Sequence, residues 1–184
     1  MDEIEFVNYI CEAMTKVGNE YLNVEMAFDL SGRKEKRRRE RVYAYELYHQ
    51  MRLLQADFNE YTINGEIDKR GHKIIKEPFN PDFVIHRQGE MIGNYCVIEL
   101  KIRIDKDGIK KDFNTITRMI HYYQYKIGVF AIPGVYFSQI KPILVDIWNT
   151  QPYLQEHCGS IYVIAQDDKQ LKVKTIDEVI NGSN

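Results

Sequence analysis

The chain has 184 residues, of which 44% are hydrophobic and 28% are charged, and its formal net charge is −2. These values are ordinary for one globular domain, and the sequence contains no internal repeat or low-complexity segment. No apolar run reaches transmembrane length, and the acidic N-terminus is unlike a signal peptide. The three cysteines are odd in number and lack CxxC spacing, which argues against a disulfide framework and a zinc site. We therefore expect a cytoplasmic protein that does not enter a membrane.

The first forty residues combine a helix with a strongly basic segment. Apolar residues at helical spacing predict a helix over residues 2–17, whereas residues 20–30 fit either a strand or a short extended piece. The segment 33–41 carries seven cations against two anions, more than any other stretch. It is either a solvated linker and helix start or an arm that follows phosphate groups. In the second case the phosphate contacts fall to Arg37, Arg38 and Arg39.

A second helix is expected over residues 37–56, because Ala44, Leu47 and Met51 fall on one apolar face. Residues 61–69 have strand composition and are expected to pair antiparallel with the next strand, which begins near Asp82.

The stretch 80–102 predicts a β-hairpin, with two apolar strands separated by a glycine-containing turn. Side chains alternate between the two faces of a strand, so Glu99 and Lys101 share one face and Leu100 lies on the other. The hairpin can bring Asp82 on the first strand beside Glu99 and Lys101 on the second. Such charges are costly to bury without partners on strands that are otherwise apolar.

A third helix is expected from about residue 107 to residue 126. Lys110 and Lys111 near its start are candidates for contacts with a nucleic-acid backbone, and Arg118 and His121 lie off its apolar stripe. Residues 127–132 form an apolar run typical of a central strand, which Pro133 and Gly134 are expected to end. The remaining expected elements are a helix over 139–154 with Pro142 in its first turn, a strand over 160–166, and an edge strand leading into a short helix over 171–180.

Two carboxylates beside an ammonium group form a pocket for a hard cation. Mg²⁺ prefers oxygen ligands and usually binds through one or two carboxylates together with water and phosphate. A lysine at this position can orient or deprotonate a water molecule, because a bound metal and neighbouring charges tune its pKa. The alternative is a surface hairpin with an exposed ion pair, but the apolar neighbours of Glu99 argue against exposure.

At these residues the sequence resembles the PD-(D/E)XK nuclease superfamily. Pro81-Asp82 is similar to the "PD" element, and Glu99-Leu100-Lys101 is similar to "(D/E)XK". The resemblance implies an α/β fold, with a central mixed β-sheet flanked by helices in a restriction-endonuclease-like core. We expect a single domain over 1–184, with the nuclease-like core at about 37–132. An N-terminal helix over 1–30 and C-terminal helix and strand additions over 135–184 would complete it.

Family members often carry a further carboxylate on the helix that packs against the sheet. The resemblance favours Glu46, within Tyr-Glu-Leu-Tyr-His-Gln, whereas the helical wheel favours Glu40, which lies on the apolar face. Glu66, on the strand predicted over 61–69, is another alternative. We therefore expect Glu46 to be the further carboxylate, with Asp82, Glu99 and Lys101 as the other catalytic residues.

The resemblance implies a metal-dependent nuclease that uses Mg²⁺ or Mn²⁺ and hydrolyses phosphodiester bonds, with DNA as the expected partner. Asp82, Glu99 and Glu46 would be the metal ligands. The alternatives are a non-catalytic nucleic-acid-binding or assembly module of the same fold, and an RNA nuclease. The chain leaves little room for a separate specificity domain, so we expect the protein to recognise nucleic-acid structure or ends, to work as a homodimer, or to rely on a partner subunit for specificity. No P-loop, HExxH or GxSxG motif is present.

Overall fold

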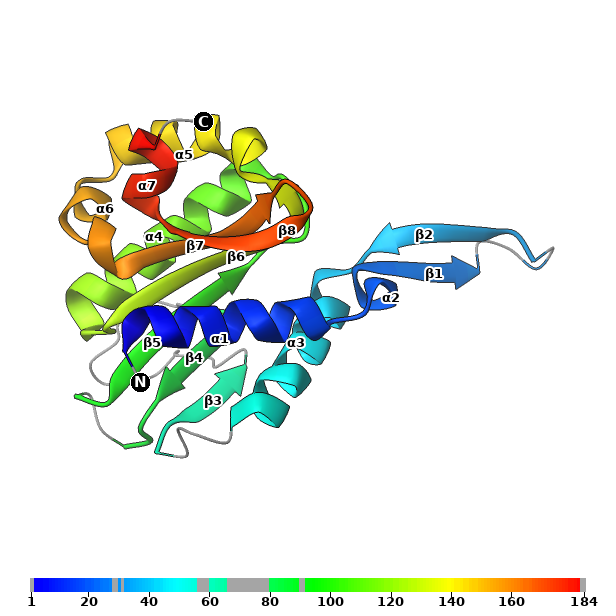
Figure 1. Ribbon diagram of the computed structural model, residues 1–184, viewed down its shortest axis with the longest axis horizontal. Helices are drawn as coiled ribbons and strands as arrows, with labels where there is room; N and C mark the ends of the chain where they lie inside the picture. Colours follow the sequence, from blue (N-terminus) through cyan, green and yellow to red (C-terminus); the bar gives the residue numbers. More distant parts are fainter. Residues whose placement is uncertain are drawn as a thin grey trace.

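The computed structural model describes residues 2–27, 30, 32–55, 60–65, 80–89 and 92–182. Its centre is a six-stranded sheet of order β3-β4-β5-β6-β7-β8 with helices on both sides (Figure 1). The strands are β3 (Thr62–Gly65), β4 (Phe83–His86), β5 (Asn94–Leu100), β6 (Ile127–Tyr136), β7 (Ile161–Asp167) and β8 (Gln170–Thr175). The pairs β5–β6 and β6–β7 are parallel, and the other three pairs are antiparallel. The expected α/β class with a mixed sheet flanked by helices is therefore confirmed.

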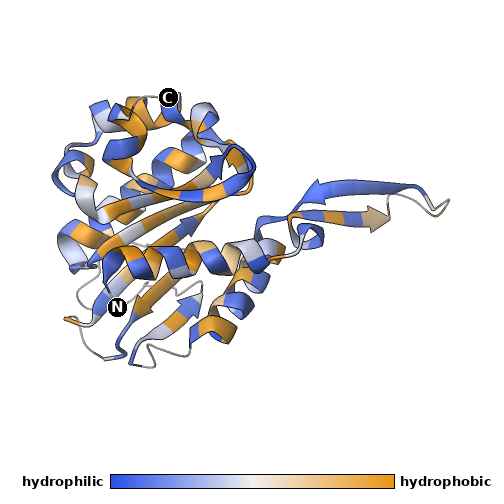
Figure 2. Ribbon diagram, viewed as in Figure 1, coloured by the Kyte–Doolittle hydropathy of each residue, from blue (hydrophilic) through white to orange (hydrophobic). Residues whose placement is uncertain are grey.

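The helices form two layers, each with its own hydrophobic core. On one face α1 (Glu3–Lys16) and α3 (Glu40–Leu54) bury Phe6, Ile10 and Leu47 against the sheet. The helices of the other face are α4 (Lys106–Tyr123), α5 (Phe137–Thr150), α6 (Pro152–Glu156), η2 (Cys158–Ser160) and α7 (Ile176–Asn181). Figure 2 shows apolar residues along the central strands and, between hydrophilic ones, along the helices that cover them. None of the described helices combines the length and apolar character needed to cross a membrane.

The hairpin predicted over 80–102 is present as β4 and β5. Val84 pairs with Val97 and Phe83 with Ile98 in an antiparallel register. All seven residues of β5 are buried, because helices cover both faces of this strand. The strand predicted over 61–69 is confirmed at Thr62–Gly65 and pairs antiparallel with β4. The rest of that segment, including Glu66, lies outside the described residues.

Residues 34–38 of the basic segment form a strand, and the prediction that a helix begins at about Arg37 is wrong. After a single helical turn, α2 (Asn19–Leu22), the strands β1 (Asn23–Ala27) and β2 (Lys34–Arg38) pair antiparallel. They form an arm that extends away from the rest of the molecule (Figure 1). Helix α3 begins at Glu40, because cross-strand pairing holds the backbone extended up to Arg38 and Arg39 is the extended N-cap residue.

Two boundaries near β6 also differ from the sequence-based expectation. Strand β6 does not end at Pro133 but continues to Tyr136 across an irregular register. Proline lacks a donor for the ladder and is tolerated at such an irregularity, and Gly134 takes a positive φ of 69° beside it. Helix α5 begins at Phe137, so Pro142 lies beyond its first turn. The central position of β6, the strand β7, and β8 followed by α7 are confirmed.

The contact between β6 and α4 depends on a glycine. A Cβ atom at Gly128 would lie 2.2 Å from Cγ2 of Ile116, closer than non-bonded carbons approach. We therefore expect Gly128→Ala to lower the free energy of unfolding by about 1–3 kcal/mol through overpacking. Gly159→Ala is the matched control, because a Cβ atom there meets nothing within 4 Å. Chemical denaturation measures both, and equal effects would contradict this close packing.

Candidate active site

Asp82, Glu99 and Lys101 meet at one end of the hairpin. Asp82 directly precedes β4, and the register that pairs Phe83 with Ile98 places it opposite the end of β5. The backbone N–H of Leu100 donates a hydrogen bond of 2.7 Å to Oδ2 of Asp82. The structure thus brings together the three residues that the sequence singled out.

Lys101 is held by groups from three elements. Its Nζ lies 2.8 Å from Oδ2 of Asp112 on α4 and 3.6 Å from Oε1 of Glu40 on α3. It also donates a hydrogen bond of 3.2 Å to the carbonyl oxygen of Leu100 on β5. The ammonium group therefore ties both helical layers to the end of the sheet.

Carboxylates outnumber ammonium groups in this cluster. Glu99 and Asp112 are only 5% and 4% exposed, and the Lys101 side chain is 15% exposed. Glu99 and Asp112, together with Asp82 and Glu40, place four carboxylates near this one partly buried lysine. A buried excess of negative charge is costly unless protons or cations balance it.

Three acids of the cluster, Asp82, Glu99 and Asp112, hold their protons more tightly than usual. Burial and the charges of Asp112 and Asp82 raise the pKa of Glu99 well above its ordinary value. Burial also raises the pKa of Asp82, although the Leu100 N–H and Lys101 oppose it. Burial raises the pKa of Asp112 to about 6 despite the ion pair with Lys101. A cation that replaced these protons would relieve the same electrostatic cost.

Lys101 stays protonated in this environment. Burial alone would lower the pKa of its ammonium group, but the hydrogen bond and charge of Asp112 and the charges of Glu40 and Asp82 raise it overall. The side chain is therefore suited to hold a water molecule or balance negative charge rather than to accept a proton.

The structure separates the two glutamates proposed for α3. Glu40 lies within ion-pair distance of Lys101, whereas Glu46 accepts a hydrogen bond of 2.6 Å from Gln50 on its own helix. The helical wheel had indicated Glu40, because residues on the apolar face of α3 point toward the sheet. The structure thus brings Glu40 into the cluster and does not bring Glu46 there. Glu66 lies outside the described residues.

Asp112 was missed by sequence reasoning, although a signal was present. It lies on the buried side of α4, three residues after Ile109 and four before Ile116, and a charged residue inside an apolar stripe indicates a buried partner. Of the two lysines proposed on α4, Lys111 is close enough for its charge to lower the pKa of Glu99. Lys110 is exposed.

The three arginines proposed as phosphate contacts differ in their surroundings. Arg38 donates a hydrogen bond of 2.7 Å to the carbonyl oxygen of Ile102, beside the cluster. Arg37 pairs with Glu35 on the arm, and Arg39 contacts the sulfur atom of Met26. Arg38 thus anchors the base of the arm near Lys101.

A cavity of about 370 Å³ adjoins Asp82. Its lining includes Tyr45 and Tyr48 of α3 together with Gly65 and Phe83. The ring of Tyr48 is stacked on Phe83 with centroids 6.4 Å apart, and Tyr45 is exposed. The carboxylate end of the hairpin is therefore open toward an aromatic surface.

Comparison of the chain with models of protein families, with curated proteins and with solved structures found no significant match. Any function of the chain is therefore inferred from its own residues and their arrangement.

The pKa of Asp112 predicts how stability depends on pH. The folded protein binds this proton more tightly than the unfolded chain, so stability falls as pH rises from about 4 to about 6. In EDTA, we expect Asp112→Asn to gain on the order of 2–3 kcal/mol in free energy of unfolding relative to wild type between pH 4 and pH 8. Chemical denaturation at both pH values measures the change. Asp107→Asn, at an exposed position of the same helix, is the control, and an equal response in both variants would contradict the burial argument.

Proposed function

We propose that the chain is a metal-dependent nuclease of the PD-(D/E)XK type that hydrolyses phosphodiester bonds in DNA. One observation carries this proposal: Asp82, Glu99 and Lys101 converge at the end of a buried hairpin, where carboxylates exceed cations. A surface ion pair would not explain why Glu99 is almost fully buried.

The donor set fits a hard divalent cation. Asp82 and Glu99 offer carboxylate oxygens, and the Leu100 carbonyl follows Glu99 on the chain, which is the ligand chemistry that Mg²⁺ and Mn²⁺ prefer. Glu40 takes the place of Glu46 as the further carboxylate, because it lies beside Lys101. When bound, such an ion polarises the scissile phosphate and lowers the pKa of a coordinated water molecule.

Lys101 positions the attacking water and balances the charge that develops on the phosphate. Its ammonium group remains protonated because Asp112 and Glu40 surround it. Asp112 fixes the direction of the lysine side chain from α4, so we assign it a positioning role.

The arm and the cavity suit a nucleic-acid substrate. The described part of the arm carries more cations than anions, the latter being Glu25 and Glu35, and Figure 2 shows that β2 is hydrophilic along its length. Basic groups on a projecting hairpin can follow phosphates. The tyrosines beside Asp82 offer ring faces on which an unpaired base can stack.

The first test is cleavage. We expect Lys101→Ala to lower the rate of Mg²⁺-dependent DNA cleavage by roughly 10²–10³, the usual contribution of a positioned electrostatic group. DNA affinity should change little. Supercoiled, linear and branched DNA are the substrates, and Lys141→Ala on α5 is the control. RNA in a parallel reaction identifies an RNA nuclease.

Two results would overturn the assignment. Cleavage at the wild-type rate by Lys101→Ala would remove the lysine from the reaction. DNA binding without cleavage of any substrate, in Mg²⁺ and in Mn²⁺, would identify the chain as a non-catalytic binding module instead.

The second test concerns the arm. Lys36 and Arg37 lie on its exposed surface, so their joint replacement by alanine should leave the fold intact. We expect weaker DNA binding, with the log–log salt slope reduced by about 0.9 for each phosphate group that the arm no longer neutralises. Lys169→Ala with Lys172→Ala, at exposed positions around β8, is the charge-matched control. An unchanged slope in the arm variant would remove the arm from the DNA interface.

A further inference from the structure

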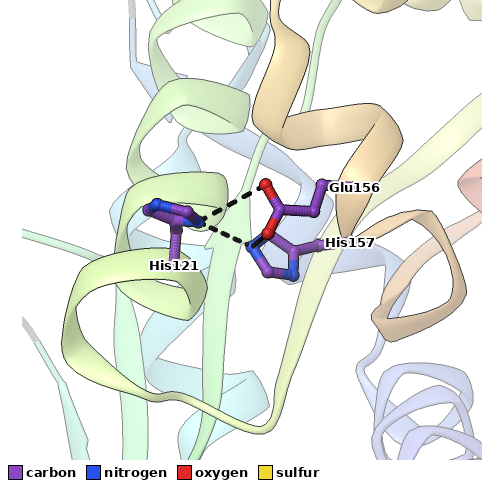
Figure 3. A group of neighbouring side chains, drawn as sticks. All are labelled: His121, Glu156 and His157. Carbon is purple, nitrogen blue, oxygen red and sulfur yellow. Dashed lines mark hydrogen bonds and ion pairs between the residues drawn. The ribbon is translucent and has the colours of Figure 1, made fainter.

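A second cluster of potential metal ligands, which the nuclease proposal does not use, consists of His121, Glu156 and His157. His121 lies near the end of α4, Glu156 is the last residue of α6, and His157 follows it. Figure 3 shows the three side chains directed toward one another from these two segments. One ligand atom from each residue lies within 4.8 Å of the others.

The distances between these atoms match those between the ligands of one metal ion. Nδ1 of His121 lies 3.1 Å from Nε2 of His157 and 3.7 Å from Oε2 of Glu156. Nε2 of His157 lies 3.9 Å from Oε1 of Glu156. Ligands of tetrahedral Zn²⁺, with bonds of about 2.0–2.1 Å, are separated by roughly 3.4 Å. The three groups can therefore reach one ion with small side-chain rotations.

Aromatic neighbours hold the cluster in place. The ring of Tyr153 is stacked on His121 with centroids 4.0 Å apart, and the Tyr122 hydroxyl donates a hydrogen bond of 2.9 Å to the Tyr153 hydroxyl. The backbone N–H of His157 donates to the Tyr153 carbonyl, which fixes the end of α6. Because neighbouring groups orient the ligands before an ion arrives, binding costs less ordering entropy.

The charges also favour a cation. Within the part of the chain that the structure describes, the carboxylate of Glu156 lies beside the two imidazoles and forms no ion pair with a lysine or arginine. Two imidazole nitrogens and one carboxylate oxygen form a donor set typical of Zn²⁺ and other late first-row ions. Mg²⁺ prefers oxygen ligands alone, so this cluster and the carboxylates around Lys101 differ in metal preference.

We propose that His121, Glu156 and His157 bind one Zn²⁺ ion. The side chains of His121 and His157 are 27% and 22% exposed and that of Glu156 is 55% exposed, so solvent reaches the cluster and water completes the coordination. The ion joins the end of α4 to the segment between α6 and η2. It thereby stabilises the layer of helices on which Asp112 is carried.

The test uses a background that separates the two metal sites. In Asp82→Asn/Glu99→Gln protein with excess Mg²⁺, isothermal titration with Zn²⁺ should show one equivalent bound, and Zn²⁺ should raise the melting temperature. Co²⁺ should bind with the same stoichiometry and give a visible absorption band that Zn²⁺ abolishes. Failure of DNA cleavage would leave these results unchanged, so the two proposals fail independently.

Two substitutions and one control complete the test. We expect His121→Ala to weaken Zn²⁺ binding by at least about 100-fold, more than loss of a group that only orients a ligand. Glu156→Gln, at a half-exposed position where folding is not at risk, should weaken it in the same direction. His49→Ala, at an exposed histidine on α3, should bind like the background protein. Absence of stoichiometric Zn²⁺ binding in the background, or equal affinity in all variants, would overturn the proposal.

Discussion

The ion pair between Lys101 and Asp112 is the interaction on which the arrangement at the end of the sheet depends. Strand β5 is covered on both faces, so Glu99 is buried by its position in the strand. That burial leaves negative charge in a region of low polarity, and its cost is high without partners. Lys101 offsets part of this charge, and Glu40 on α3 and Asp112 on α4 hold its ammonium group in place. The packing of the two helical layers therefore determines which charges meet in the cluster.

The pairing of β4 with β5 could be predicted from sequence because its determinants are local. Alternation of apolar residues sets the faces, and the short separation of the two strands favours an antiparallel pair, so Asp82 was placed beside Glu99 and Lys101 correctly. The partner from α3 was harder to choose. A motif-like segment favoured Glu46, but the rotation of the helix about its axis places Glu40 at the cluster. The helical periodicity of α3 therefore predicted which glutamate lies at the cluster, whereas the motif resemblance did not.

The role of Asp112 and the conformation of the arm were missed for different reasons. To predict the contact of Asp112 with Lys101, one must know which strand α4 packs against, and tertiary contacts decide that packing. The basic segment has no apolar alternation, so nothing local distinguishes a strand from the start of a helix. Its conformation is decided by pairing with β1, whose own composition was ambiguous. In the cluster of His121 with Glu156 and His157, likewise, residues far apart in sequence meet only after α6 has packed against α4.

The projecting arm also affects how copies of the protein behave toward one another. Within the described part of the chain, β1 and β2 pair only with each other, so their outer edges keep unpaired backbone groups. Such edges invite strands from other molecules, and proteins commonly protect them with lysine and other charged residues. The dense positive charge of β2 therefore keeps two arms apart by repulsion. Salt that screens this repulsion would therefore weaken the protection of these edges.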